Sequence, residues 1–242
     1  CNFVQYLAGV CASLSSTYHP AYLPASDYGS GVPMISASVV SDLMRARLEG
    51  VLYDPTHADY DRLRRVHNAI IERRPGAIVQ AATASDVQKV VRIAADREVT
   101  LAVRCGGHSF AGLGTCDHGI VCDLSRMNAV FVDPQARTVE VGGGALLGDV
   151  DAAGEEYGLV TPAGAVSHTG VGGLTLGGGM GYLSRRFGLT IDSLTGVDLI
   201  TADGKLLRVG PEEEPDLFWA IRGGGGNFGV VTKFKSVSYT HL

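Results

Sequence analysis

One histidine stands in a setting that suits chemistry, because residues 104–109 read Arg-Cys-Gly-Gly-His-Ser and place His108 directly after two glycines. Glycines that follow a strand allow backbone N–H groups to approach an anion closely, and Ser109 adds a hydroxyl donor. This arrangement suits a diphosphate group, with Arg104 supporting the loop. Taken alone, the spacing favours a simpler interpretation, an ordinary turn that carries a histidine by chance.

A second candidate is the glycine-rich tract of residues 164–181, which contains Thr-Gly-Val-Gly-Gly-Leu-Thr-Leu-Gly-Gly-Gly-Met-Gly. Such a loop suits the wrapping of a flat ring system or a diphosphate. Its spacing is similar to the dinucleotide-binding motif, but that motif requires an apolar strand before it, and Pro-Ala-Gly stands at 162–164. No Lys-Ser or Lys-Thr follows the glycines, which excludes a P-loop. A nucleotide bound here is therefore held by another fold.

A third tract, residues 218–231, reads Phe-Trp-Ala-Ile-Arg-Gly-Gly-Gly-Gly-Asn-Phe-Gly-Val-Val. Alone it predicts a helix, a glycine turn and a strand, with Trp219 in the core. The 33 glycines of the chain are about twice the usual share, and they gather at 106–107, 142–144, 170–181 and 223–226. Glycines bunched in this way indicate backbone held close to a bulky ligand.

The elements that position these tracts follow from hydrophobic periodicity. A strand at 78–81, an amphipathic helix at 85–97 behind the capping box Ser85–Gln88, and a strand at 100–104 predict a βαβ unit. Further strands are predicted at 120–124, 129–132, 138–141, 197–201, 206–209 and 228–234, and helices at 41–50, 59–73, 146–157 and 216–222. The pattern is α+β, with an irregular arm at 1–40, one continuous domain at 41–236 and an unpatterned tail at 237–242.

Composition excludes several classes of protein. The net charge of −5 includes no long run of either sign, so we expect no nucleic-acid face. No apolar run approaches the ~18 residues of a membrane span. Five cysteines without a CxxC pair argue against a disulfide framework. Cys116 and His118 with His108 lack a fourth ligand, so no metal site is predicted.

The three tracts together carry more information than each alone. In this order they resemble the FAD-binding domain of the p-cresol methylhydroxylase and vanillyl-alcohol oxidase superfamily, over about residues 45–236. Within it, the chain is similar to the bacterial FAD-linked oxidases of the berberine-bridge-enzyme type. The resemblance implies two α+β subdomains with FAD between them. It also implies that His108 bonds to the 8α-methyl carbon of the flavin.

The resemblance also implies further site residues. The cofactor-binding positions it indicates are Arg104, Cys105, Gly106, Gly107, Ser109, Gly164, Ser167, Gly170, Gly172, Gly173, Gly177, Gly178 and Val230. Many relatives carry a second attachment cysteine where this chain has Val166, so a single covalent link is expected. His168 departs from the family pattern, and it either lies near the flavin or is a polar loop residue. His57 and His67 are expected to be surface residues of an N-terminal helical region.

The implied activity is that of an oxidase, in which FAD takes a hydride from a small-molecule alcohol, sugar, amine or phenolic substrate and molecular oxygen is the electron acceptor. Thr169 falls where relatives control oxygen access, which leaves oxidase and dehydrogenase open. The substrate domain that follows in this family is absent from the 242 residues, so the sequence assigns no catalytic residue. One alternative is an FAD-binding module or truncated fragment without turnover, and another is a non-covalent flavin reductase that uses NAD(P)H. Residues 8–13 are compatible with the remains of an export signal but lack its basic start, which slightly favours the cytoplasm.

Overall fold

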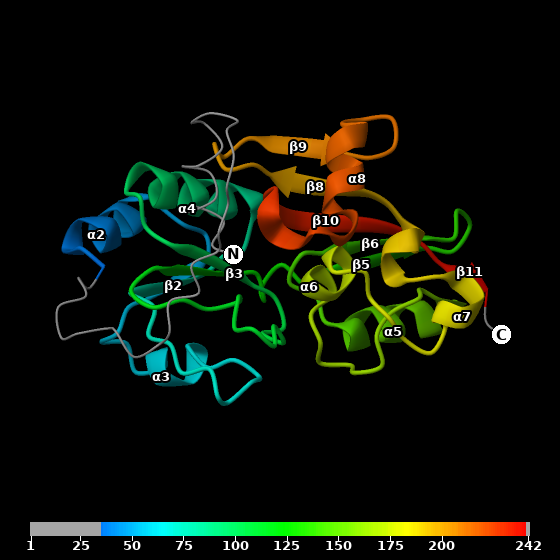
Figure 1. The fold of residues 1–242 in the computed structure, drawn as a ribbon, viewed down its shortest axis with the longest axis horizontal. Helices are drawn as coiled ribbons and strands as arrows, with labels where there is room; N and C mark the ends of the chain where they lie inside the picture. Colours follow the sequence, from blue (N-terminus) through cyan, green and yellow to red (C-terminus); the bar gives the residue numbers. More distant parts are fainter. Residues whose placement is uncertain (1–34, 241–242) are drawn as a thin grey trace, which may run out of the picture.

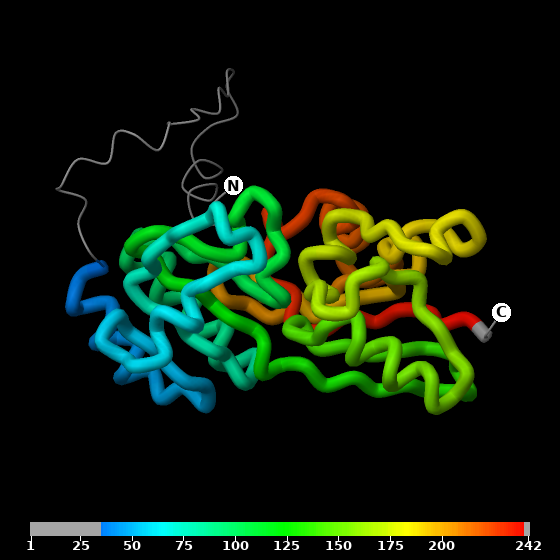
Figure 2. Tube along the Cα trace, turned by 90° about the horizontal axis from the view of Figure 1, so that it is seen from below, coloured from blue at the N-terminus to red at the C-terminus, as the bar shows by residue number. Residues whose placement is uncertain are grey.

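The computed structural model describes residues 35–240, so the arm at 1–34, with its short small-residue stretch, and residues 241–242 lie outside the described part. The described chain forms two main sheets, each covered by its own helices, and a small two-stranded sheet. The two main sheets lie side by side along the long axis (Figure 1). We name residues 35–125 the first lobe and residues 129–240 the second lobe. Figure 2 shows the blue and cyan first lobe at one end and the yellow to red second lobe at the other.

The first lobe is built on a mainly parallel sheet. Its order is β1-β2-β4-β3, formed by Val51–Tyr53, Ala77–Gln80, Ile120–Asp123 and Leu101–Arg104. The predicted βαβ unit is present, with α4 (Ala84–Asp96) between β2 and β3, although β4 separates the two strands. Val79 packs in one core with α4 and α2 (Ala37–Arg45), and Ile78 packs in another with Tyr60. Both faces of the sheet are thus buried, as parallel sheets require.

Two predicted helix starts in this lobe are wrong. The helix expected at 41–50 is α2, which begins at Ala37 and ends at Arg45. It stops early because the Asp86 carboxylate accepts the backbone N–H groups of Glu49 and Gly50, each at 2.9 Å, and holds these residues in a bend outside the helix. The helix expected to begin behind Ser85 is instead capped by Thr83, whose hydroxyl accepts the N–H of Asp86 at 3.3 Å.

The amphipathic helix expected at 59–73 is also wrong. Only α3 (Tyr60–Leu63) is helical there, and Ile70, predicted to face the core, is 89% exposed. The side chain of Asn68 accepts the backbone N–H of Ile70 at 3.2 Å, which makes a turn where the helix would continue. The rest of the segment is therefore a loop.

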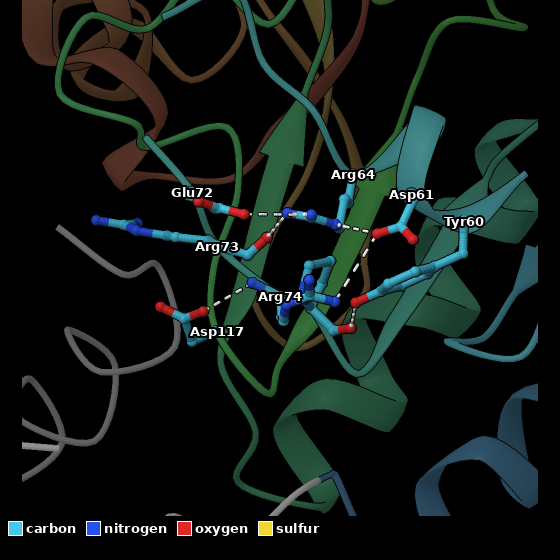
Figure 3. A network of polar contacts seen from close by, with 8 residues as sticks. Tyr60, Asp61, Arg64, Glu72, Arg73, Arg74 and Asp117 are labelled. Atoms are coloured by element: carbon cyan, nitrogen blue, oxygen red, sulfur yellow. Dashed lines mark hydrogen bonds and ion pairs between the residues drawn. The ribbon is translucent and has the colours of Figure 1, made fainter. Parts of the chain in front are cut away.

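Figure 3 shows the polar network that holds this loop, formed by Tyr60, Asp61, Arg64, Glu72, Arg73, Arg74 and Asp117. Arg64 is buried, and its guanidinium donates to the Asp61 carboxylate at 2.7 Å and to the Arg73 carbonyl at 3.3 Å. The Tyr60 hydroxyl donates to the Pro75 carbonyl at 2.6 Å. These contacts join residues up to fifteen positions apart, whereas the periodicity of a helix reports only neighbours three and four positions apart.

The second lobe is built on an antiparallel sheet. Its order is β5-β6-β10-β8-β9, formed by Val130–Asp133, Thr138–Gly142, Val230–Val237, Leu194–Ile200 and Leu206–Val209. Its helices are α5 (Leu147–Glu155), α6 (Val171–Leu176), α7 (Ser184–Phe187) and α8 (Pro215–Gly224), with short 3-10 turns at Thr190–Ser193 and Gly225–Asn227. The strands predicted at 197–201 and 206–209 are confirmed as β8 and β9, which pair as a hairpin that turns at Asp203-Gly204. The helix predicted at 216–222 is α8, which begins at Pro215, a residue that suits the first position of a helix.

Two further expectations for the second lobe need correction. Trp219, expected in the core, is 78% exposed, because Phe218 and Ile221 supply the buried face of α8. The tail expected to be unpatterned contains β11 (Tyr239–Thr240), which pairs with β7 (Leu159–Val160).

The two lobes share one core at their junction. Ile200 and Val230, from β8 and β10 of the second lobe, pack into the core beneath α4 of the first lobe. The side chains of Gln88 and Arg92 on α4 donate to the Gly204 carbonyl at 2.7 and 3.1 Å. The lobes are thus fixed against each other, which defines the shape of the space between them. Among the described residues, no helix has the length and apolar character that crossing a membrane demands.

Candidate functional site

The three glycine tracts meet around a single cavity of about 640 Å³ between the two lobes. This volume lies within the usual range of small-molecule and cofactor sites, about 300 to 1,000 Å³. Eleven of the site residues predicted from the sequence line it: Arg104, Cys105, Gly106, Gly107, His108, Ser109, Gly170, Gly172, Gly173, Gly177 and Val230. The end of β3, the entry to α6 and the start of β10 thus converge on one space.

Three predicted positions do not line this cavity. Gly164 packs towards the Leu174 side chain, and Gly178 lies beside Leu189. Ser167 is exposed, and its carbonyl accepts the backbone N–H of Gly148 at 2.8 Å. These residues shape the loops before and after α6 rather than the cavity wall.

The lining also includes residues that we did not predict as site residues. They are chiefly glycines of two further clusters and their neighbours: Gly143, Gly223, Gly224, Gly225, Gly226, Asn227 and Gly229. The bunching of glycines at 142–144 and 223–226 was the available signal. A methyl group built on Gly225 or Gly226 would meet nothing within 4 Å, so backbone there borders open space.

The first two tracts touch through their backbones. A Cβ atom built on Gly106 would lie 2.9 Å from the Cα of Gly170, and one built on Gly170 would lie 2.8 Å from the Cβ of Cys105. Real Cβ atoms do not approach other atoms so closely. The glycines at 106 and 170 are therefore required by the close approach of the two chains.

Arg104 has the supporting role that the sequence indicated. It lies opposite Asp123 in the β3–β4 pair, and its Nε and Nη2 donate to the Asp123 Oδ2 at 3.2 and 2.6 Å. The second carboxylate oxygen of Asp123 accepts the backbone N–H of Ser125 at 2.8 Å. Arg104 Nη1 is buried and has no hydrogen-bond partner among residues 35–240. Because Arg104 lines the cavity, this unpaired donor is a candidate partner for a ligand that binds there.

His108 belongs to a cluster of three histidines at the edge of the cavity. Its Nε2 lies 2.7 Å from the Nδ1 of His168, and its ring is stacked on that of His67 with the centroids 4.0 Å apart. Only His108 of the three lines the cavity. The backbone N–H of His67 donates to the Gly107 carbonyl at 3.1 Å, which fixes the loop of residues 64–73 over the motif.

The positions of the two other histidines agree with the sequence predictions to different extents. His67 is exposed, as expected, but it lies in a loop and stacks on His108 instead of lying in a helix. His168 lies beside His108, so the first of its two alternatives, a position near the expected flavin site, is the one that the geometry favours. The sequence held no local signal for this cluster, because residues 67, 108 and 168 are far apart and meet only through the loop network and the glycine contact.

The surroundings of His108 favour its neutral form. Partial burial lowers the pKa of its imidazole, and the neighbouring His67 and His168 lower that pKa further. At neutral pH the ring is thus uncharged, with a lone pair on one nitrogen. A neutral imidazole at a cavity wall is a nucleophile.

The same cluster also brings three metal-ligating groups together. Within residues 35–240, ring nitrogens of His67, His108 and His168 all lie within 4.8 Å of one another. The rings of His67 and His108 are nearly parallel, with an interplanar angle of 16°. Because imidazole lone pairs lie in the ring plane, two stacked rings cannot direct them at one ion. The arrangement suits a nucleophile with flanking rings better than a metal centre.

The cysteines near the site are not nucleophiles. Burial raises the pKa of the Cys105 thiol, and its Sγ donates to the Ala145 carbonyl at 3.3 Å. Burial also raises the pKa of Cys116 to about 11, and its Sγ lies 3.7 Å from the Ile120 carbonyl. Both thiols are protonated at neutral pH, and a thiolate is the form that attacks. Val166, the position of a second attachment in relatives, is 46% exposed and carries no nucleophile.

These features fit a large anionic cofactor with a flat ring system. Thirteen of the 29 residues that line the cavity are glycines, so a diphosphate can approach the backbone closely along those parts of the wall. The buried Arg104 Nη1 supplies a donor, and His108 supplies a nucleophile at the edge. The residues present therefore fit FAD.

Comparison with known proteins agrees with this fit. Residues 75–210 match the family described as FAD binding domain. The chain is 36% identical to (R)-6-hydroxynicotine oxidase of Paenarthrobacter nicotinovorans over 192 aligned residues. The alignment covers 79% of this chain and 42% of that protein.

Two solved structures show the same fold. Xylooligosaccharide oxidase from Myceliophthora thermophila C1, in complex with xylobiose, is 33% identical with a TM-score of 0.80, over 84% of this chain and 43% of that one. Glucooligosaccharide oxidase from Acremonium strictum, with a 6-S-cysteinyl, 8α-N1-histidyl FAD, is 30% identical with a TM-score of 0.79. The matched region covers 84% of this chain and 43% of that one. This chain spans less than half the length of each of these relatives.

Proposed function

The chain belongs to the family of FAD-binding domains shared by these oxidases, and we propose that it holds FAD in the glycine-lined cavity through a covalent bond to His108. The observation that carries the proposal is the placement of a neutral histidine at the edge of a cavity formed by three glycine tracts. Such a bond anchors the cofactor and makes the flavin a stronger oxidant.

The parts of the cavity have distinct roles in this proposal. Gly106 and Gly107 present backbone to the diphosphate, and Arg104 Nη1 donates to an oxygen of the cofactor. When bound, FAD supplies the acceptor for a hydride taken from a substrate carbon. The Arg104–Asp123 pair holds the end of β3 in place, so that the loop which carries His108 starts from a fixed point.

The proposed activity is oxidation of a small-molecule alcohol, sugar or amine, with molecular oxygen as the electron acceptor. Its support is the relatives, which are named as oxidases of 6-hydroxynicotine, xylooligosaccharides and glucooligosaccharides. We also propose a single covalent link. Support for this comes from Val166, which has no nucleophilic atom, and from Cys105, whose thiol stays protonated.

Acid precipitation of the purified protein tests the covalent bond. We expect the yellow flavin to stay with the pellet of the unchanged protein, and to enter the supernatant for His108→Ala. Flavin released from the unchanged protein would refute the attachment. A second experiment mixes the holoprotein with a panel of alcohols, sugars and amines without air. Bleaching of the flavin absorbance supports turnover, and no bleaching with any of them favours a binding module.

A further inference from the structure

The contact between His108 and His168 has a consequence for how the bond to FAD forms. We propose that His168 accepts the Nε2 proton of His108 during attachment, while the link itself forms through His108 Nδ1, as in the 8α-N1-histidyl FAD of the Acremonium strictum relative. The proposal deepens the proposed function and rests on it. It starts from the 2.7 Å distance between His108 Nε2 and His168 Nδ1.

The distance restricts the tautomers of the pair. Two imidazole nitrogens at 2.7 Å share one hydrogen, which sits on one of them and is accepted by the other. If His168 donates, His108 Nε2 uses its lone pair as the acceptor, and the one hydrogen of the neutral His108 ring sits on Nδ1. Neither nitrogen of His108 then has a free lone pair. If His108 donates from Nε2, its Nδ1 is free to attack. Attack thus requires the tautomer in which His168 is the acceptor.

The position of the two rings relative to the cavity agrees with this assignment. His108 lines the cavity, whereas His168 does not. The Nε2 side of the His108 ring therefore faces His168, and its other nitrogen points away from that residue. His168 is exposed to solvent, so a proton that it receives can pass on to water.

His67 positions the same ring from its face. It stacks on His108 with the centroids 4.0 Å apart, and its backbone N–H is bonded to Gly107, the residue before His108. Stacking leaves the in-plane direction of Nδ1 free while it restricts rotation of the ring. We therefore assign His67 as a positioning residue and His168 as the proton acceptor.

The reaction balances as follows. A C–N bond forms between His108 Nδ1 and the 8α carbon of FAD, while a C–H bond at that carbon and the N–H bond at His108 Nε2 break. His168 takes the proton from Nε2, and the 8α proton leaves to solvent. The two electrons from the broken C–H bond reduce the flavin. Molecular oxygen then takes these two electrons and two protons, which gives hydrogen peroxide and restores the oxidised flavin.

The test measures the rate of attachment, not the turnover of substrate. Flavin-free protein is incubated with FAD in air, samples are precipitated with acid, and the flavin in the pellet is followed with time. Because a general base contributes about 100-fold or more, we expect His168→Ala to slow attachment by about 100-fold. Non-covalent FAD affinity, measured by quenching of FAD fluorescence before attachment, should stay close to that of the unchanged protein. Added imidazole should restore part of the rate.

Two further variants separate proton transfer from structure. His168→Asn keeps an acceptor for the His108 N–H but no base, so we expect it to be slow as well. His57→Ala is the matched control, because His57 is an exposed histidine that contacts Tyr53 rather than His108. It should attach FAD at the unchanged rate. Attachment by His168→Ala at the unchanged rate would overturn the proposal while the bond to His108 stands.

Two measurements on the unchanged protein need no variant. Nitrogen-15 NMR of the flavin-free protein should show the His108 proton on Nε2, and peptide analysis of the flavinylated protein should show the link at Nδ1. A proton on Nδ1, or a link through Nε2, would overturn the proposal even if His168→Ala fails to fold. An unchanged protein without covalent flavin would refute the proposed function, and this inference with it.

Discussion

The backbone contact between Gly106 and Gly170 gives the sharpest prediction for the site. In Gly106→Ala, the new methyl group would lie 2.9 Å from the Cα of Gly170 and 3.0 Å from the His168 carbonyl oxygen. Ordinary contact begins at 3.4 Å, so the two tracts must separate. Both neighbours are backbone atoms and cannot rotate away. We therefore expect a cost of about 1 to 3 kcal/mol, the usual range for overpacking.

Urea unfolding followed by circular dichroism measures this cost. With a slope of about 2 to 3 kcal/mol per molar urea, the midpoint should fall by about 0.3 to 1.5 M. The separation also moves the His168 loop, so attachment of FAD should be slower. An unchanged midpoint for Gly106→Ala would show that the two tracts are not in contact and would refute the reasoning.

Gly173→Ala is the matched control, because the same substitution there should change stability in the opposite direction. Gly173 lies in α6, and a methyl group built on it meets nothing within 4 Å. Replacement of glycine by alanine inside a helix stabilises by about 0.5 to 1 kcal/mol, so the urea midpoint should rise. Because Gly173 lines the cavity, the methyl group should weaken FAD binding at the same time. The two variants thus separate the roles of glycine in packing and in ligand access.

Three more predictions follow from buried charge and from pKa. Arg104→Met should cost about 3 to 5 kcal/mol in urea unfolding, because Asp123 is left buried without its partner. The double variant Arg104→Met with Asp123→Asn should recover part of the lost unfolding free energy but not the affinity for FAD. Full recovery of the affinity would contradict the role of Arg104 Nη1. Asp86→Ala should cost about 3 kcal/mol in the same assay, because the backbone N–H groups of residues 49, 50 and 82 lose their acceptor. The attachment rate should decline as pH falls, with a midpoint below 6.5, because burial and the neighbouring His67 and His168 lower the pKa of His108 from that value and its neutral form attacks. A decline centred above pH 6.5 would contradict the lowered pKa of His108.

The parts of the fold that periodicity predicted are those stabilised by local contacts. The α4 helix repeats apolar residues at Val87, Val90, Val91 and Ala94, and all four are buried. The α8 helix begins at a proline, and the β8–β9 hairpin turns at Asp203-Gly204. Each of these features depends on residues within one turn of the chain. Eleven of the 29 residues in the cavity wall were predicted for another reason, the joint order of three glycine tracts, which reflects a ligand rather than local structure.

Long-range contacts decided the features that the sequence did not predict. The helix expected at 59–73 is replaced by a loop because Arg64 is buried against Asp61 and the Arg73 carbonyl. A helix through this segment would keep the i,i+3 pair with Asp61 but would remove the Arg73 carbonyl as an acceptor for the buried guanidinium. Loss of that acceptor costs more than the few tenths of a kcal/mol per residue that helix propensity supplies. The same loop carries His67 to His108. The wrong helix and the missed histidine cluster therefore have one cause, the folding of a charged loop over the Gly-Gly-His motif, and that cause is visible only when residues 60–75, 104–109 and 168 are brought together.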